Sequence, residues 1–286
     1  MLISVVIPVY NGGRFLAECL SSIADQDYED FEVIVNDDPR SNDDAEGVVK
    51  EMRDKGMNVR HLRKNTSMAL GRKEGAAVAK GELIVHLDVD MQMSRGLLGE
   101  CVALIESGYD ALVIPEESYG ISFWARCRWL ERKCYTGVEP LEALRCIKRD
   151  IYRELGGHNP EMVYFEDKDF DLRVRRQGYK VGSTVNLIYH NEGDLSLRVI
   201  LRKRVGYARS AVIAARYYPE EIRLRGSLLY RYRLFFNNRS LFAADPILGL
   251  GTVFMKTCEF IVSGWSFYTA GRQSRVPLEG GSGGPL

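Results

Sequence analysis

The chain has 286 residues, of which 45% are hydrophobic and 27% charged, and its formal net charge is zero. This length allows one large domain or two modest ones with a buried core, and the ordinary composition excludes a collagen-like or disulfide-rich chain. The charge is unevenly placed. Residues 195–239 carry eleven basic and two acidic residues, a net of +9, whereas residues 1–194 carry 25 basic and 34 acidic residues, a net of −9. An acidic body joined to a basic segment indicates a polyanionic partner, either nucleic acid or anionic lipid.

The cysteines and the chain ends bear on the cellular compartment. The six cysteines have neither zinc-site spacing nor histidine partners, so we expect them to be reduced, cytosolic and mostly structural. Residues 1–4 run straight into a strand, so we expect no signal peptide. The segment 276–286 is rich in glycine and resembles an artificial linker, and the fold prediction omits it.

Strands and helices alternate along the first 87 residues. Strands are expected at 2–10, 31–35, 59–62 and 81–87, with helices around 15–23, 48–52 and 68–80. Pro8 should end the first strand, because proline cannot donate to a ladder. Short connections between alternating strands and helices predict a doubly wound, mostly parallel α/β sheet.

Two carboxylates, Asp88 and Asp90, follow the strand at 81–87. Side chains at the carboxyl end of such a strand point into the crevice where ligands bind in open α/β sheets. Together with the amide oxygen of Gln92, they form an all-oxygen set suited to Mg²⁺ or Mn²⁺, metals that usually also hold substrate phosphates. A loop whose acidic residues cap the next helix explains the pair equally well, so other motifs have to decide.

Four segments occur in a characteristic order. They are Pro8-Val9-Tyr10-Asn11, the acidic loop Asn36 to Asp43, Gly71-Arg72-Lys73-Glu74-Gly75, and Lys80 to Ile84 before the paired carboxylates. This order resembles the nucleotide-binding half of family-2 glycosyltransferases with the GT-A fold. The chain departs from the family pattern at Pro39-Arg40, where Gly-Ser is usual, and at Gly71 and Lys73, where alanine and asparagine are usual.

The resemblance implies an inverting enzyme that uses a nucleotide-sugar such as a UDP- or GDP-sugar. Val9 and Tyr10 would form a slot for the base, Asp38 would accept from a base or ribose donor, and Arg72 offers a fork for phosphate or carboxylate. The expected nucleotide-sugar-binding residues are Pro8, Val9, Tyr10, Asp38, Arg72 and Asp88.

A helix and a strand are expected over 97–115, followed by an aromatic, basic helix over 118–135. In the family the equivalent region lies beside the acceptor site, which places Trp124 on the acceptor side. Packing of this helix on the sheet is the plainer explanation for most of its residues. Residues 143–150 are expected to be a strand that passes into a helix, and this helix ends at Gly156-Gly157.

The segment Phe165 to Tyr179 resembles the family's second conserved motif. Asp167 is expected at the start of a helix whose dipole stabilises the ionised carboxylate. Inverting sugar transfer needs a base that takes the proton of the acceptor hydroxyl, and we expect Asp167 to be that base. Glu166 is expected to orient the acceptor or a neighbouring arginine. A capping role for Asp167 is the structural alternative.

An edge strand is expected at 181–185, followed by His190. His190 competes with Gln92 to be the further metal ligand beside Asp90, since neutral imidazole also binds Mn²⁺. A carboxylate pair followed by glutamine resembles the polyprenyl-phosphate hexose synthases of the family. The sequence leaves the choice between Gln92 and His190 open.

The C-terminal part predicts attachment to a membrane. Residues 195–217 form a basic amphipathic helix that includes Arg202 and Arg204. Residues 246–270 are apolar apart from Lys256 and Glu259, which nucleic-acid binding does not explain. The segment is long enough to span a membrane, but its charges and its glycine and serine residues favour an interfacial or re-entrant helix pair. Completion of the core or of an oligomer interface is the alternative.

We therefore predict a GT-A catalytic domain over 1–194, with a nucleotide-binding half to about 115, and a helical extension over 195–275. The predicted reaction is metal-dependent transfer of a sugar to a lipid-linked glycan or polyprenyl phosphate at the cytoplasmic membrane face. The protein would attach peripherally or monotopically, bind no nucleic acid, and be free to form homo-oligomers. A nucleotidyltransferase and a non-catalytic glycan- or lipid-binding scaffold are the alternatives.

Overall fold

The structure is a computed structural model that describes residues 1–64, 67–138, 141–163 and 165–273. The linker-like segment predicted at 276–286 lies outside these ranges.

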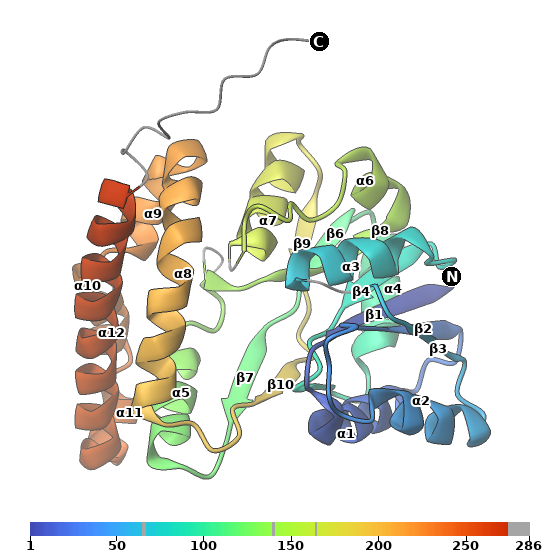
Figure 1. The fold of residues 1–286 in the computed structure, drawn as a ribbon, viewed down its shortest axis with the longest axis horizontal. Helices are drawn as coiled ribbons and strands as arrows, with labels where there is room; N and C mark the ends of the chain where they lie inside the picture. Colours follow the sequence, from blue (N-terminus) through green and yellow to red (C-terminus); the bar gives the residue numbers. More distant parts are fainter. Residues whose placement is uncertain (65–66, 139–140, 164, 274–286) are drawn as a thin grey trace.

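A seven-stranded sheet forms the centre of the molecule, in the order β3-β2-β1-β4-β8-β6-β9 (Figure 1). Only β8 runs antiparallel to its neighbours β4 and β6, which confirms the predicted mostly parallel α/β sheet. The strands are β1 (Ile3–Val9), β2 (Phe31–Asp37), β3 (Val59–Leu62), β4 (Leu83–His86), β6 (Ala111–Val113), β8 (Leu144–Lys148) and β9 (Val181–Ser183).

Pro8 lies inside β1, so the prediction that it ends the strand is wrong. Val9 accepts from the backbone N–H of Asp38 on the β2 side, whereas Val6 accepts from Leu87 on the β4 side. Alternate residues of a parallel strand face different neighbours, so Pro8 faces β4. The pairing with β4 ends at Val6, and the missing N–H of Pro8 therefore costs no ladder bond.

Helices cover both faces of this sheet (Figure 1). Val5 and Ile7 belong to one apolar cluster with α1 (Gly13–Ala24), α2 (Ala45–Asp54) and α4 (Leu97–Glu106). Val6 belongs to a second cluster, with α3 (Met68–Ala77), α6 (Arg149–Glu154) and α7 (Glu166–Arg176). Side chains alternate along a strand, so the continuous apolar run of β1 supplies both layers.

A second sheet of three strands was not predicted. It consists of β5 (Met91–Met93), β10 (Ile188–Asn191) and β7 (Glu116–Tyr119), in that order. The prediction of one helix over 118–135 is wrong at its start, because residues 116–119 pair with β10. Helix α5 (Phe123–Lys133) begins after Ser122, whose hydroxyl accepts from the N–H of Ala125.

Five helices follow within the described residues up to 273: α8 (Leu197–Tyr217), α9 (Pro219–Arg225), α10 (Leu228–Asn237), α11 (Arg239–Ala244) and α12 (Pro246–Gln273). The expected re-entrant pair is wrong, because α12 is one continuous helix of 28 residues. Lys256 and Glu259 are buried where α12 packs on α5 and α8, so these charges do not break the helix. By length and composition, residues 246–272 suffice to cross a membrane.

Candidate active site

Arg72 of α3 joins three of the predicted site carboxylates. Its side chain is only 2% exposed. Its Nη2 donates to Asp88 Oδ1 at 2.6 Å, while its Nη1 donates to Asp167 Oδ1 at 2.6 Å and to Glu166 Oε1 at 3.1 Å. Charge-assisted bonds from one planar guanidinium fix the three groups relative to one another. Two of the segments singled out in the sequence, one with Asp88 and one at 165–179, thus meet at a single buried cation.

Arg145 on β8 is a second buried cation that the sequence prediction did not single out. Its Nη2 lies 3.2 Å from Asp88 Oδ2 and 2.5 Å from Glu116 Oε1. Burial would raise the pKa of Glu116, but Arg145 and Arg132 lower it to about 2. The signal in the sequence is an arginine between the apolar residues Leu144 and Cys146 of the strand.

The adjacent carboxyls of Glu166 and Asp167 differ in exposure and in acidity. The side chain of Asp167 is 29% exposed and that of Glu166 is 8% exposed. Burial and the neighbouring Asp167 raise the pKa of Glu166 to about 7. Burial opposes ionisation of Asp167 too, but Arg72, His158 and Arg145 hold its pKa well below the usual value. Asp167 is therefore ionised at neutral pH and is the more accessible of the two.

His158 is a buried neighbour of Asp167 that the sequence prediction missed. Its Nε2 lies 3.2 Å from Asp167 Oδ1, and its Nδ1 lies 2.9 Å from the Tyr152 hydroxyl. Burial lowers the pKa of His158 despite the opposing hydrogen bond with Asp167, which favours the neutral ring. A neutral ring that accepts from Tyr152 at Nδ1 carries its proton at Nε2, facing Asp167. Apart from the preceding glycine pair, nothing in the sequence marks His158.

Asp90 and His190 face each other at the second sheet. Asp90 Oδ2 lies 3.2 Å from His190 Nε2. Gln92, the competing metal ligand, instead donates from Nε2 to Glu18 Oε2 at 2.9 Å and to the Tyr119 hydroxyl at 2.7 Å. Within the described ranges, no group of three or more His, Cys, Asp or Glu side chains is arranged to hold a metal ion. A carboxylate and an imidazole nevertheless fit a divalent ion that takes its other ligands from substrate phosphates and water.

The expected base slot lies at the ends of β1 and β2. Tyr10 is 56% exposed and follows directly on Pro8 and Val9. Both oxygens of the buried Asp38 accept from Arg40, at 2.9 Å from Nε and 2.5 Å from Nη2, and Arg40 also lies 5.8 Å from the centre of the Tyr10 ring. Arg40, one of the departures from the family pattern, therefore lies between the two expected base contacts.

The residues expected on the acceptor side contact α12 or solvent, away from Arg72 and its carboxylate partners. Trp124 packs against Phe254 of α12, with 6.3 Å between ring centres. Arg204 Nη2 lies 3.2 Å from Glu259 Oε1, also of α12. Arg202 is exposed on α8 beside Arg198.

A family model and several curated proteins resemble part of this chain. The family model described as "Glycosyl transferase family 2" matches residues 4–163. Among curated relatives, the glycosyltransferase GlyG of Streptococcus pneumoniae is 38% identical over 92 residues, which are 31% of this chain and 30% of that protein. The GalNAc(5)-diNAcBac-PP-undecaprenol beta-1,3-glucosyltransferase of Campylobacter jejuni is 30% identical over 110 residues, or 37% of this chain and 35% of that protein. The matched stretches thus span about a third of these relatives.

Solved structures support the fold over nearly the whole chain. The mannosyltransferase PcManGT from Pyrobaculum calidifontis, in complex with GDP-Man and Mn²⁺, has a TM-score of 0.63 at 17% identity, covering 93% of this chain and 86% of that chain. Residues 1–349 of Staphylococcus aureus TarS, in complex with UDP-GlcNAc, have a TM-score of 0.56 at 16% identity, covering 96% and 92%. The matched family model covers more than half of the chain, and its fold is that of the GT-A enzymes. The protein belongs to glycosyl transferase family 2.

Proposed function

We propose that the protein is an inverting, metal-dependent glycosyltransferase with a UDP- or GDP-sugar as its donor. Its acceptor is a lipid-linked glycan or polyprenyl phosphate at the cytoplasmic face of the membrane. The proposal rests on one observation: the buried guanidinium of Arg72 donates both to Asp88 and to Asp167, and so holds the two carboxylates close together. Donor and base must meet in this way for direct transfer.

Asp167 is the proposed base. The acceptor hydroxyl attacks the anomeric carbon of the donor sugar, the bond to the diphosphate breaks, and the hydroxyl proton passes to the Asp167 carboxylate. His158 and Arg72 hold this carboxylate in place, while Glu166 completes the contacts of Arg72. An acceptor phosphate is already nucleophilic, and with such an acceptor Asp167 positions it without taking a proton.

Asp90 and His190 are the proposed protein ligands of a Mg²⁺ or Mn²⁺ ion. Such an ion would supply positive charge to the departing diphosphate. Gln92 keeps its amide on Glu18 and Tyr119, which favours His190 in the choice that the sequence left open. PcManGT, which shares this fold, binds GDP-Man together with Mn²⁺, and this supports a metal requirement.

The nature of the donor and acceptor rests on the relatives. PcManGT binds GDP-Man and TarS binds UDP-GlcNAc, which supports a nucleotide-sugar donor. The Campylobacter relative is named for a glycan on undecaprenol diphosphate, which supports a lipid-linked acceptor. We assign donor chemistry to residues 1–194 and attachment at the membrane to residues 195–275.

The test is transfer of labelled sugar from a panel of UDP- and GDP-sugars to native membrane lipids. We expect Asp167→Asn to lose about 10²–10⁴-fold in turnover to a hydroxyl acceptor. Asp150→Asn, at a carboxylate that is 90% exposed, is the control and should keep normal turnover. Near-normal turnover of Asp167→Asn would overturn the base assignment. Absence of both transfer and metal-dependent nucleotide release from every donor would overturn the enzymatic function.

A further inference from the structure

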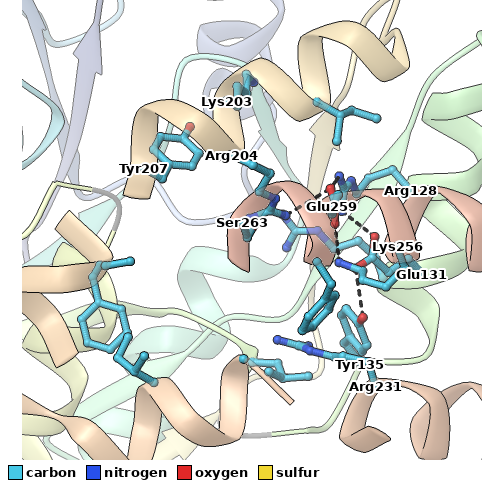
Figure 2. Close-up of a pocket in the computed structure, with 18 of the residues that line it drawn as sticks. Arg128, Glu131, Tyr135, Lys203, Arg204, Tyr207, Arg231, Lys256, Glu259 and Ser263 are labelled. Carbon is cyan, nitrogen blue, oxygen red and sulfur yellow. Dashed lines mark hydrogen bonds and ion pairs between the residues drawn. The ribbon is translucent and has the colours of Figure 1, made fainter. Parts of the chain in front are cut away.

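A cavity of about 740 Å³ lies between the candidate active site and the C-terminal helices (Figure 2). This volume is within the range of small-molecule sites, about 300–1,000 Å³. Glu116 and His190 of the second sheet, with Glu192 directly after β10, form one wall, and residues of α5, α8, α9, α10 and α12 contribute to the others. His190 lies 3.2 Å from Asp90, so a molecule in the cavity lies next to the proposed metal ligands.

Most charged side chains in the cavity wall are paired with one another. Glu259 contacts three cations (Figure 2). Glu116 contacts two. Three cations that line the cavity have no carboxylate partner in the part of the chain that the structure describes: Lys203, Arg223 and Arg231. The buried Arg231 Nε also has no hydrogen-bond partner there, and the guanidinium of Arg231 lies 4.7 Å from the centre of the Tyr135 ring. These cations make the cavity suitable for binding an anion.

Lys203 brings this charge towards the active site. Lys203 lines the cavity together with His190, whose Nε2 lies 3.2 Å from Asp90 Oδ2. Lys203 belongs to α8, outside the stretch that matches the family model. Its neighbours Arg202 and Arg204 do not share this role, because Arg202 does not line the cavity and Arg204 is paired with Glu259.

The remaining wall is largely apolar. Its apolar residues include Ile200, Tyr207, Ala208 and Ala211 of α8, Ile222 of α9, and Phe260 and Phe267 of α12. Phe260 and Phe267 are two turns apart on α12, and Ile200, Tyr207 and Ala211 lie at helical spacing on α8. A free sugar would leave this surface uncovered, whereas a hydrocarbon chain would cover it. Unpaired cations beside an apolar wall suit an anionic group on an apolar chain.

We propose that this cavity binds the acceptor and that the acceptor is a phosphate or diphosphate on a prenyl-like chain. Lys203 binds the phosphate oxygens, and the apolar faces of α8 and α12 cover the chain. This inference rests on the proposed transferase function and adds the acceptor's site and chemistry to it.

A substitution that fills the cavity tests its occupancy. Gly264 lines the cavity, and a Cβ added there meets open space. Gly206 on α8 also leaves open space but lies outside the lining, so Gly206→Leu is the matched control. Each change replaces a helical glycine with a residue of higher helix propensity, so both variants should fold. With farnesyl phosphate as the probe in calorimetry, we expect Gly264→Leu to weaken binding at least tenfold and Gly206→Leu to leave it unchanged. Equal binding by both variants would overturn the site.

A charge substitution tests the chemistry of the ligand. We expect Lys203→Ala to weaken binding of farnesyl phosphate about tenfold without changing the weaker binding of farnesol. Arg209→Ala, at an exposed arginine of the same helix outside the cavity, should change neither. Inorganic phosphate that competes as strongly as farnesyl phosphate would show a site for free phosphate and overturn the prenyl assignment. Equal loss of farnesol and farnesyl phosphate binding would overturn the role of Lys203.

Binding of UDP or GDP to the same variants separates this inference from the proposed function. A protein that binds nucleotide but not farnesyl phosphate would contradict the cavity assignment alone. A protein that binds farnesyl phosphate but neither nucleotide nor nucleotide-sugar would contradict the transferase function and retain the site. We expect both ligands to bind, each with its own sensitivity to substitution.

Discussion

Glu166 and Asp167 share one arginine and have pKa values displaced in opposite directions. The pKa of Glu166 is raised from 4.5 to about 7 in the folded protein. The unfolded chain loses this proton first as pH rises, so Glu166 contributes stability below about pH 4.5 that is lost as pH passes 7. We expect the free energy of unfolding of the natural protein to fall more steeply over this window than that of Glu166→Gln. Between pH 4.5 and 8 the natural protein should lose about 1–3 kcal/mol more of its free energy of unfolding than Glu166→Gln. Urea denaturation across this pH range measures both. Parallel plots of the free energy of unfolding against pH would contradict the expectation.

His158 is expected to act as a positioning residue through Asp167. His158→Phe removes the donor and should lower kcat about tenfold, while the KM for the donor sugar stays unchanged. His158→Gln keeps an N–H near Asp167 and should restore most of the turnover. The measurement is steady-state kinetics of both variants, with their melting temperatures as a check on folding. Equal kcat in the two variants would show that the ring only fills space.

Only part of this residue-scale network could be predicted. Arg72, Asp88, Glu166 and Asp167 belong to recognisable segments, and the structure brings them together across 95 positions of sequence. Arg145 reaches Asp88 because β8 inserts antiparallel beside β4, and no local pattern reports such a pairing. Placement of His158 likewise depends on burial among Tyr152 and other aromatic rings.

Among the elements, α12 shows how two charged residues in an apolar segment can mislead a prediction from sequence. Lys256 and Glu259 within an apolar run predicted an interrupted, interfacial helix pair. Three-dimensional packing reverses that conclusion, because Glu259 meets Arg128 and Arg204 from two other helices. Hydropathy along one segment contains no information on partners elsewhere in the chain. The short strands β5, β7 and β10 escaped prediction similarly, since they pair only with one another.

Removal of one member of this ionic cluster should be costly. Glu259 is only 2% exposed, and its loss leaves Lys256, Arg128 and Arg204 with too little negative charge. We expect Glu259→Gln to lower the free energy of unfolding by about 3–5 kcal/mol. Glu220→Gln, at an exposed position of α9, is the control and should change it by less than about 0.5 kcal/mol. Chemical denaturation provides the measurement, and equal stabilities would show that the cluster contributes nothing net.

At the scale of the whole molecule, the outer face of α12 is the proposed membrane contact. Ile247, Leu250, Phe254, Ile261 and Trp265 are exposed at helical spacing, while α5 and α8 cover the opposite side. A helix that is covered along one side and apolar on the other suits a position in the plane of the interface. Basic residues of 195–239 supply attraction to anionic headgroups, about 1 kcal/mol for each that reaches the surface.

We therefore expect the protein to sediment with vesicles that contain anionic lipid, and much less with neutral vesicles or in high salt. The double substitution Phe254→Asp and Trp265→Asp should reduce the bound fraction at least tenfold, because it places two carboxylates against the bilayer. Leu229→Asp, at an 82% exposed position of α10, is the matched control. Binding of the double variant equal to that of the natural protein would remove α12 from the contact. Absence of sedimentation with every vesicle would separate catalysis from the membrane, and the acceptor cavity would then have to receive its ligand from solution.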